Sequence, residues 1–135
     1  MKIEIFYQEN EDKNYSYIKQ EYIARIEKYC DFSIINTYPV KDEKTFFILI
    51  TDLGEDVSSD VLSRKIDSIL TCGYSKIVFF LIQKDKRKLD NEQKIYFDYN
   101  LNLSSIKSTF DMKLIFLLEQ VYRCFKINNG EIYHK

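Results

Sequence analysis

The chain has 135 residues, of which 45% are hydrophobic and 30% charged, and its formal net charge is −1. This composition is typical of a globular domain with its own core, and three Gly and one Pro exclude a long low-complexity linker. The small net charge excludes nucleic-acid binding through an overall positive field, so any RNA contact must come from a local patch. We therefore expect residues 1–135 to form a single domain.

The cysteines Cys30, Cys72 and Cys124 are widely spaced and form no CxxC pair. With one histidine in the chain, they do not match a zinc site, and we predict no metal. We predict instead buried, reduced thiols that pack as small apolar groups. Residues 1–5 are typical of a strand rather than a signal peptide, and no apolar run is long enough to cross a bilayer. We expect a cytoplasmic protein without membrane contact.

The first half of the chain alternates strand and helix patterns. Lys2–Tyr7 predicts a strand, Tyr15–Tyr29 a helix, and Phe32–Thr37 a second strand. The apolar stripe of the helix comprises Ile18, Tyr22, Ile26 and Tyr29. Thr45–Thr51 is continuously apolar, as in a strand buried on both faces of a parallel sheet. The following Asp52-Leu53-Gly54 predicts a turn.

A second helix is predicted between an N-cap cluster at Ser58-Ser59-Asp60 and a stop near Gly73. Its expected apolar face comprises Val61, Leu62, Ile66, Ile69 and Leu70. Lys76–Ile82 predicts another buried strand. These alternating elements indicate an α/β fold around a mostly parallel sheet.

The second half adds a charged loop at Lys84–Lys88, a short helix at Leu89–Lys94 and a strand at Tyr96–Leu103. A last helix is expected to begin near Ser108 or Thr109. It is apolar over most of its circumference, so it must be buried on more than one side. We predict that it packs against both the sheet and a partner subunit.

Four segments resemble the RlmH family, the SPOUT-class methyltransferases that act on a pseudouridine of large-subunit ribosomal RNA. Ile50-Thr51-Asp52-Leu53-Gly54 with Ser58-Ser59 is similar to the family's Leu-Asp-x-x-Gly…Ser-Ser. Ile77–Ile82 resembles the strand before its glycine-rich loop, and Leu101–Ile106 resembles Leu-Ser-Leu-Ser-Lys-Met. Glu119–Lys135, with its Tyr-His-Lys ending, resembles the family's tail almost residue for residue.

The resemblance implies an α/β trefoil knot, a homodimer, and transfer of methyl from S-adenosylmethionine to N3 of the pseudouridine. It implies that Tyr133, His134 and Lys135 reach the partner's site. Ribosomal RNA or the ribosome, and not DNA, is the implied partner. The implied cofactor pocket comprises Thr51, Leu103, Ser104, Ser105, Ile106, Lys107 and Ser108.

The chain departs from the family at the cofactor. Gln83–Lys88 has no glycine where the family has Gly-Gly-x-x-Gly, and a Cβ there obstructs close backbone approach. Lys107-Ser108-Thr109-Phe110 replaces Thr-x-Pro-His, and Thr51 replaces a cofactor-contacting leucine. The segment before Thr45 is shorter, as if a helix were lost. One alternative is therefore a catalytically silent dimeric module that binds RNA or protein; another is a different α/β enzyme.

Other candidate sites each have a structural explanation as well. Lys84–Lys88 is either an RNA-phosphate patch or a solvated loop, and Asp52 either contacts a ribose or begins a turn. Arg123, Lys126 and Lys135 form a second candidate patch, although cations also favour a helix C-terminus. The aromatic residues at helix or strand spacing are predicted to be core: Tyr7, Tyr17, Tyr22, Tyr29, Tyr122 and Phe125.

Overall fold

The computed structural model describes residues 1–7, 15–81, 96–103 and 110–130. This part of the chain forms one five-stranded sheet and three helices. The elements in chain order are β1 (Lys2–Tyr7), α1 (Ser16–Ile26), β2 (Asp31–Ile35), β3 (Thr45–Asp56), α2 (Ser59–Thr71), β4 (Lys76–Leu81), β5 (Tyr99–Asn102) and α4 (Phe110–Asn128).

The strands lie in the order β2-β1-β4-β3-β5, and every neighbouring pair is parallel. The predicted parallel sheet is therefore confirmed. Its strands β1 and β4 are buried at every residue after the first, and β4 is almost continuously apolar, as expected when both faces of a parallel sheet are covered. Since all strands point the same way, their carboxyl ends share one edge of the sheet.

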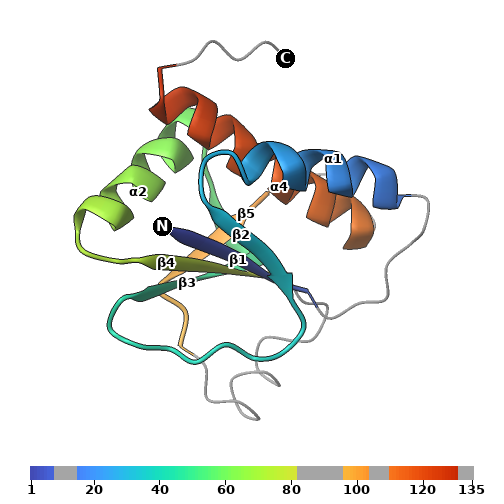
Figure 1. Cartoon of the computed structure of the whole chain (residues 1–135). Coiled ribbons are helices and arrows are strands. Elements are labelled where there is room, and N and C mark those ends of the chain that lie inside the picture. Colours follow the sequence, from blue (N-terminus) through green and yellow to red (C-terminus); the bar gives the residue numbers. More distant parts are fainter. Residues whose placement is uncertain (8–14, 82–95, 104–109, 131–135) are drawn as a thin grey trace.

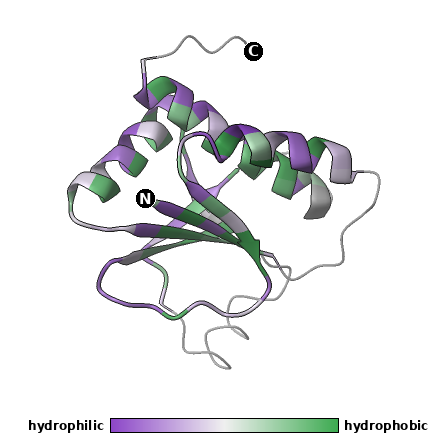
Figure 2. Ribbon diagram, viewed as in Figure 1, coloured by the Kyte–Doolittle hydropathy of each residue, from purple (hydrophilic) through white to green (hydrophobic). Residues whose placement is uncertain are grey.

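Helices α1, α2 and α4 all lie on one side of the sheet (Figure 1). Their inward residues pack with alternate strand residues in one large core, which includes Ile26 of α1, Ile66 of α2 and Leu117 of α4. Hydrophilic and hydrophobic bands alternate along the three helices (Figure 2), as in helices with one buried face. In the described part of α4 the fully buried side chains lie on one face, which packs against α2, α1 and the sheet.

The other face of the sheet has a smaller core made by the remaining strand residues. Phe6, Phe47, Leu49, Val78 and Phe80 are all buried there, and Ile35, Tyr38 and Phe97 pack against them. Residues 36–44, which join β2 to β3, contain no helix. This agrees with the shortened segment expected there.

The boundaries of α2 confirm the sequence-based prediction. Ser58 is the N-cap, and its hydroxyl accepts a hydrogen bond from Val61 N at 3.2 Å. Gly73 ends the helix with a φ of 99°, a conformation that costs glycine little. Val61 itself is 39% exposed, so its predicted place on the buried face is wrong. The physical reason is helix geometry: Leu62, Ile66 and Ile69 share the buried face, and Val61 lies roughly 100° away from Leu62 around the helix.

Three further expectations are corrected. Tyr17 is 80% exposed rather than core, because it lies in the first turn of α1, outside the face that packs on α4. Cys72 is exposed at the C-cap of α2, while Cys30 is half-buried and Cys124 buried, all as free thiols. The last strand is shorter than predicted and covers only Tyr99–Asn102. The predicted helix at 89–94 and loop at 84–88 lie outside the described residues.

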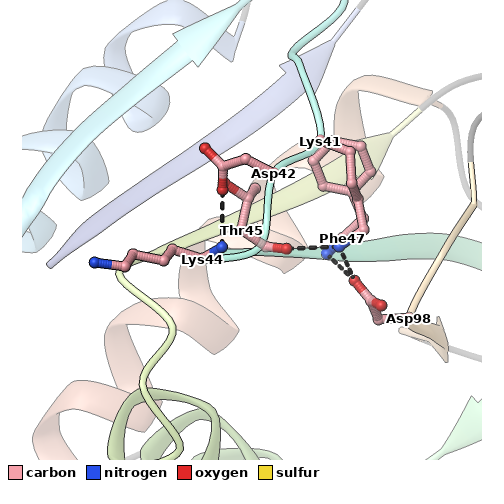
Figure 3. A network of polar contacts seen from close by, with 6 residues as sticks. All are labelled: Lys41, Asp42, Lys44, Thr45, Phe47 and Asp98. Carbon is pink, nitrogen blue, oxygen red and sulfur yellow. Dashed lines mark hydrogen bonds and ion pairs between the residues drawn. The ribbon is translucent and has the colours of Figure 1, made fainter.

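A polar network fastens the amino end of β3 to the chain that enters β5 (Figure 3). Asp98 Oδ2 accepts hydrogen bonds from Phe47 N at 2.8 Å and Lys41 Nζ at 2.7 Å, and Asp98 N donates to Phe47 O at 2.9 Å. Lys41 Nζ also donates to Thr45 O at 2.6 Å. Asp98 directly precedes β5. Its side chain thus connects this part of the chain to β3 and to the segment between β2 and β3.

Candidate functional site

The carboxyl edge of the sheet is the candidate site, because ligands of open α/β sheets bind outside the carboxyl ends of the strands. At this edge β3 lies between β4 and β5. Among the described residues, the end of β3 at 51–56 and the end of β5 with Leu103 contribute the residues expected to contact a ligand.

The end of β3 is a bulged strand and not the turn expected at Asp52-Leu53-Gly54. Ile50 and Glu55 both pair with Leu101, so residues 51–54 are extra residues of β3 without a counterpart on β5. Pairing resumes at Asp56 with Asn102. The turn prediction is wrong because the long-range pairing with β5 overrides a local Asp-x-Gly preference. Bulges are frequent beside active sites, where they redirect side chains away from the regular ladder.

Gly54 closes the bulge through contact between backbones. A Cβ on Gly54 would lie 2.6 Å from Leu101 C, 2.7 Å from Leu101 N and 2.8 Å from Asn100 C. No side chain fits at such distances, so this position requires glycine. In the segment that resembles the family's Leu-Asp-x-x-Gly, the need for the glycine is therefore explained by close packing of β3 against β5.

Two predicted cofactor residues are described, and both lie at this edge. Thr51 is the first residue of the bulge and is half-buried. Leu103 directly follows β5, is also half-buried, and packs against the main core. The other predicted residues lie outside the described residues, namely Ser104, Ser105, Ile106, Lys107, Ser108, Tyr133, His134 and Lys135. The glycine-free stretch Gln83–Lys88 also lies outside them.

Glu55, Tyr99 and Lys65 form a polar group beside the bulge that the sequence interpretation missed. The Tyr99 hydroxyl donates a hydrogen bond to the Glu55 carboxylate, and Lys65 Nζ lies 4.1 Å from the centroid of the Tyr99 ring. Burial, followed by the Glu55 charge and this hydrogen bond, raises the pKa of Tyr99. No sequence motif joins residues 55, 65 and 99, so only the pairing of β3 with β5 identifies the group.

Asn100 is a second residue that sequence patterns did not identify. Within the part of the chain described by the structure, its side-chain Oδ1 is buried without a hydrogen-bond partner. Asn100 pairs with Leu49 of β3. The next residue of β5, Leu101, is the one that pairs on both sides of the bulge. A buried unsatisfied acceptor is costly, so it is a natural contact for a donor on a ligand.

Two of the thiols, Cys30 and Cys124, do not supply a nucleophile. Burial raises the pKa of Cys30 to about 11 and that of Cys124 to about 12, so both stay protonated near neutral pH. Among the described ranges no cluster of His, Cys, Asp and Glu is arranged to hold a metal ion. No helix in those ranges is long and apolar enough to cross a membrane.

The second candidate RNA patch is partly explained by packing. Arg123 donates to Glu119 Oε1 at 2.6 Å and to Ser59 Oγ at 3.1 Å, so it joins α4 to α2. Lys126 Nζ lies 5.8 Å from the centroid of the Tyr122 ring and is half-buried. Of the three predicted cations, Arg123 therefore has a structural role, and Lys135 lies outside the described residues.

Comparison with known proteins identifies the class. Residues 37–134 match the family model described as a predicted SPOUT methyltransferase. A protein of Acetivibrio thermocellus named ribosomal RNA large subunit methyltransferase H is 34% identical over 93 residues, covering 69% of this chain and 57% of that protein.

Two other relatives align over more of their length. A putative ribosomal RNA large subunit methyltransferase H of Methanococcus maripaludis is 30% identical over 143 positions, covering 85% of this chain and 87% of that protein. A ribosomal RNA large subunit methyltransferase H of Clostridium botulinum strain Loch Maree is 32% identical, and the alignment again covers 85% of this chain and 87% of that protein. The chain therefore belongs to the SPOUT methyltransferase family, and within it to the ribosomal RNA large subunit methyltransferase H group.

Proposed function

We propose that this protein is an S-adenosylmethionine-dependent methyltransferase that modifies N3 of a pseudouridine in large-subunit ribosomal RNA. The observation that supports this most is the family match over residues 37–134, together with relatives named as large-subunit RNA methyltransferases. The parallel sheet supplies a carboxyl edge of the kind where α/β enzymes bind ligands.

The described residues at this edge fit a cationic nucleoside. The end of β3, residues 51–56, has described carboxylates on Glu55 and Asp56 and contains no Lys or Arg. These charges favour a sulfonium cation at short range, and Asn100 Oδ1 adds an unsatisfied acceptor. Bound S-adenosylmethionine would supply the methyl group. In this proposal the pocket is formed by Thr51, Leu103 and residues 104–108.

The RNA half of the proposed site is the C-terminal tail. Methylation at N3 requires loss of one imide proton, and His134 has a side chain that can accept a proton near neutral pH. Tyr133 and Lys135 would orient the base and its phosphate. Correct placement of the two reactants accounts for most of the expected rate enhancement, so little acid-base catalysis is needed.

We also propose that the protein acts as a homodimer. Helices α1 and α4 contact each other and run side by side (Figure 1). Tyr17 and Ile18 of α1 are 80% and 41% exposed, and Met112, Ile115 and Phe116 of α4 are only half-buried. Partly exposed apolar residues on both helices are consistent with a surface covered by a second copy.

Two measurements on the full chain test the proposed function. Titration calorimetry with S-adenosylmethionine should show binding at micromolar to sub-millimolar concentration. Incubation with unmodified ribosomal large subunits and methyl-labelled S-adenosylmethionine should then label one pseudouridine, found by nuclease digestion and mass spectrometry. If the protein shows no binding at millimolar ligand and no labelling of the RNA, the proposed enzyme activity is refuted.

One sequence feature favours a second candidate, the catalytically silent dimeric module. Gln83–Lys88 has no glycine at the place of the family's glycine-rich loop. A silent module would still sediment as a dimer and bind large subunits or another protein, but it would give no heat with S-adenosylmethionine. The calorimetric titration therefore separates the two functions before any RNA is used.

A further inference from the structure

Four side chains between α2 and α4 form a closed ring of hydrogen bonds. Arg123 Nη1 donates to Ser59 Oγ at 3.1 Å, and Ser59 Oγ donates to Gln120 Oε1 at 3.0 Å. Gln120 Nε2 donates to Glu119 Oε2 at 2.9 Å, and Arg123 Nη2 donates to Glu119 Oε1 at 2.6 Å. Each of the four side chains thus bonds to two others, and the ring joins the first residue of α2 to the middle of α4.

This ring is shielded from water. The side chains of Arg123 and Glu119 are only 16% and 18% exposed. Arg25 and Glu21 form an otherwise similar i,i+4 pair on α1, with side chains 42% and 47% exposed. Arg25 Cζ lies 5.7 Å from the centroid of the Tyr122 ring of α4, whereas Arg123 donates a hydrogen bond to Ser59 of another helix. The difference indicates that the Arg123 ring fixes how two helices fit together.

A second contact extends the joint towards the end of α4. Asn128 Nδ2 donates to Ser63 O at 3.2 Å, one turn beyond Ser59 on α2 and more than one turn beyond Arg123 on α4. The two contacts therefore oppose sliding or rotation of α4 along α2. They hold the last turn of α4, from which residues 131–135 continue.

The same joint lies close in sequence to the candidate cofactor edge. Helix α2 begins at Ser59, three residues after β3 ends at Asp56. The ring therefore connects the segment that follows the β3 bulge with the helix that leads into the C-terminal tail.

We propose that Arg123 is a positioning residue, which sets the register of α4 on α2 and so directs the C-terminal tail relative to the cofactor edge. This inference rests on the proposed methyltransferase function. Arg123 is not proposed to contact RNA or cofactor. Its effect on the reaction is transmitted through Ser59 and Glu119.

The test compares Arg123→Met with Arg25→Met, which removes the same guanidinium from the exposed pair. Arg123→Met should lower kcat at least tenfold, because small misplacements of reacting groups cost large factors in rate. The dissociation constant for S-adenosylmethionine should stay within twofold. Arg123→Lys keeps the charge near Glu119 but loses the second nitrogen, so its kcat should lie between those of wild type and Arg123→Met. Arg25→Met should leave both quantities within twofold.

Amide hydrogen exchange gives a readout that does not depend on activity. The amides of Asn129 and Gly130 donate to Phe125 O and Ile127 O in the last turn of α4. Their exchange should be at least tenfold faster in Arg123→Met and unchanged in Arg25→Met. A folded Arg123→Met protein with wild-type kcat, or with wild-type exchange at these amides, overturns the inference. If wild type itself transfers no methyl group, the proposed function fails, and exchange alone then decides whether Arg123 sets the helix register.

Discussion

The amino end and the carboxyl end of β3 are built differently, although they belong to one strand. At the amino end, Asp98 and Lys41 bond the backbone of β3 so that charged and polar groups have partners. At the carboxyl end, four extra residues form a bulge, and the buried Asn100 oxygen beside it has no partner within the described chain. The contrast indicates that the amino end contributes stability, while the carboxyl end is suited to a ligand.

Gly54→Ala should have the largest effect and should break the carboxyl end. The new Cβ would lie 2.6 Å from the Leu101 backbone, which has no flexible side chain to move aside. We expect separation of β3 from β5, a loss of about 2–3 kcal/mol in unfolding free energy, and at least tenfold weaker binding of S-adenosylmethionine. Urea unfolding and calorimetry measure the two effects.

Gly73→Ala is the matched control for that substitution. Gly73 has open space around its Cβ position but a φ of 99°. We expect a cost of about 1–2 kcal/mol from the backbone conformation alone, with cofactor binding unchanged. Equal binding losses in the two variants would show that Gly54 has no special role at the site.

Asp98→Ala should have the next largest effect and tests the amino end. It leaves Phe47 N and Lys41 Nζ without the acceptor they share. The expected loss is about 2 kcal/mol in urea unfolding, typical of hydrogen bonds to a charged group. Asp98→Asn keeps an acceptor for Phe47 N and should lose less than half as much. Binding of S-adenosylmethionine should be unchanged in both, and weakened binding would contradict the division between the two ends.

Tyr99→Phe should have a smaller effect that depends on pH. The pKa of Tyr99 is raised in the folded protein by burial and by Glu55, so the folded state favours the protonated hydroxyl. Its contribution is therefore complete below the ordinary tyrosine pKa of about 10 and is lost as pH rises above that value. At pH 7 we expect a loss of about 1 kcal/mol from the missing hydrogen bond.

The stability difference between wild type and Tyr99→Phe should accordingly shrink above pH 10 in urea unfolding experiments. Tyr17→Phe, on a side chain that is 80% exposed, is the control for losing a phenol oxygen. A Tyr99 difference that is constant from pH 7 to 11 would mean that Glu55 does not act on this hydroxyl.

Much of the fold could be predicted from the sequence because local patterns and tertiary contacts agree. Lys2–Tyr7 alternates and pairs as a strand, and Ser58 caps α2 through its own hydroxyl. The bulge could not be predicted, because Asp52-Leu53-Gly54 has a local turn preference that pairing with Leu101 overrides. The roles of Arg123 and Glu55 were also missed. Each depends on partners about forty or more residues away, Ser59 and Tyr99, which no short motif connects.

Asp42→Asn should have the smallest effect. It tests how the stability of the amino end of β3 depends on pH in the acid range. The Asp42 carboxylate accepts hydrogen bonds from Thr45 Oγ1 at 2.8 Å and Lys44 N at 2.9 Å, and these lower its pKa. A lowered pKa in the folded state means that the contribution is present above the ordinary value near 4 and is lost as pH falls below it. Wild type should therefore be slightly more stable than Asp42→Asn at pH 6, and the difference should vanish as pH falls towards 2. Glu43→Gln removes a neighbouring exposed charge and controls for net charge; if it reproduces the Asp42 pH profile, the hydrogen bonds at Asp42 are not the cause.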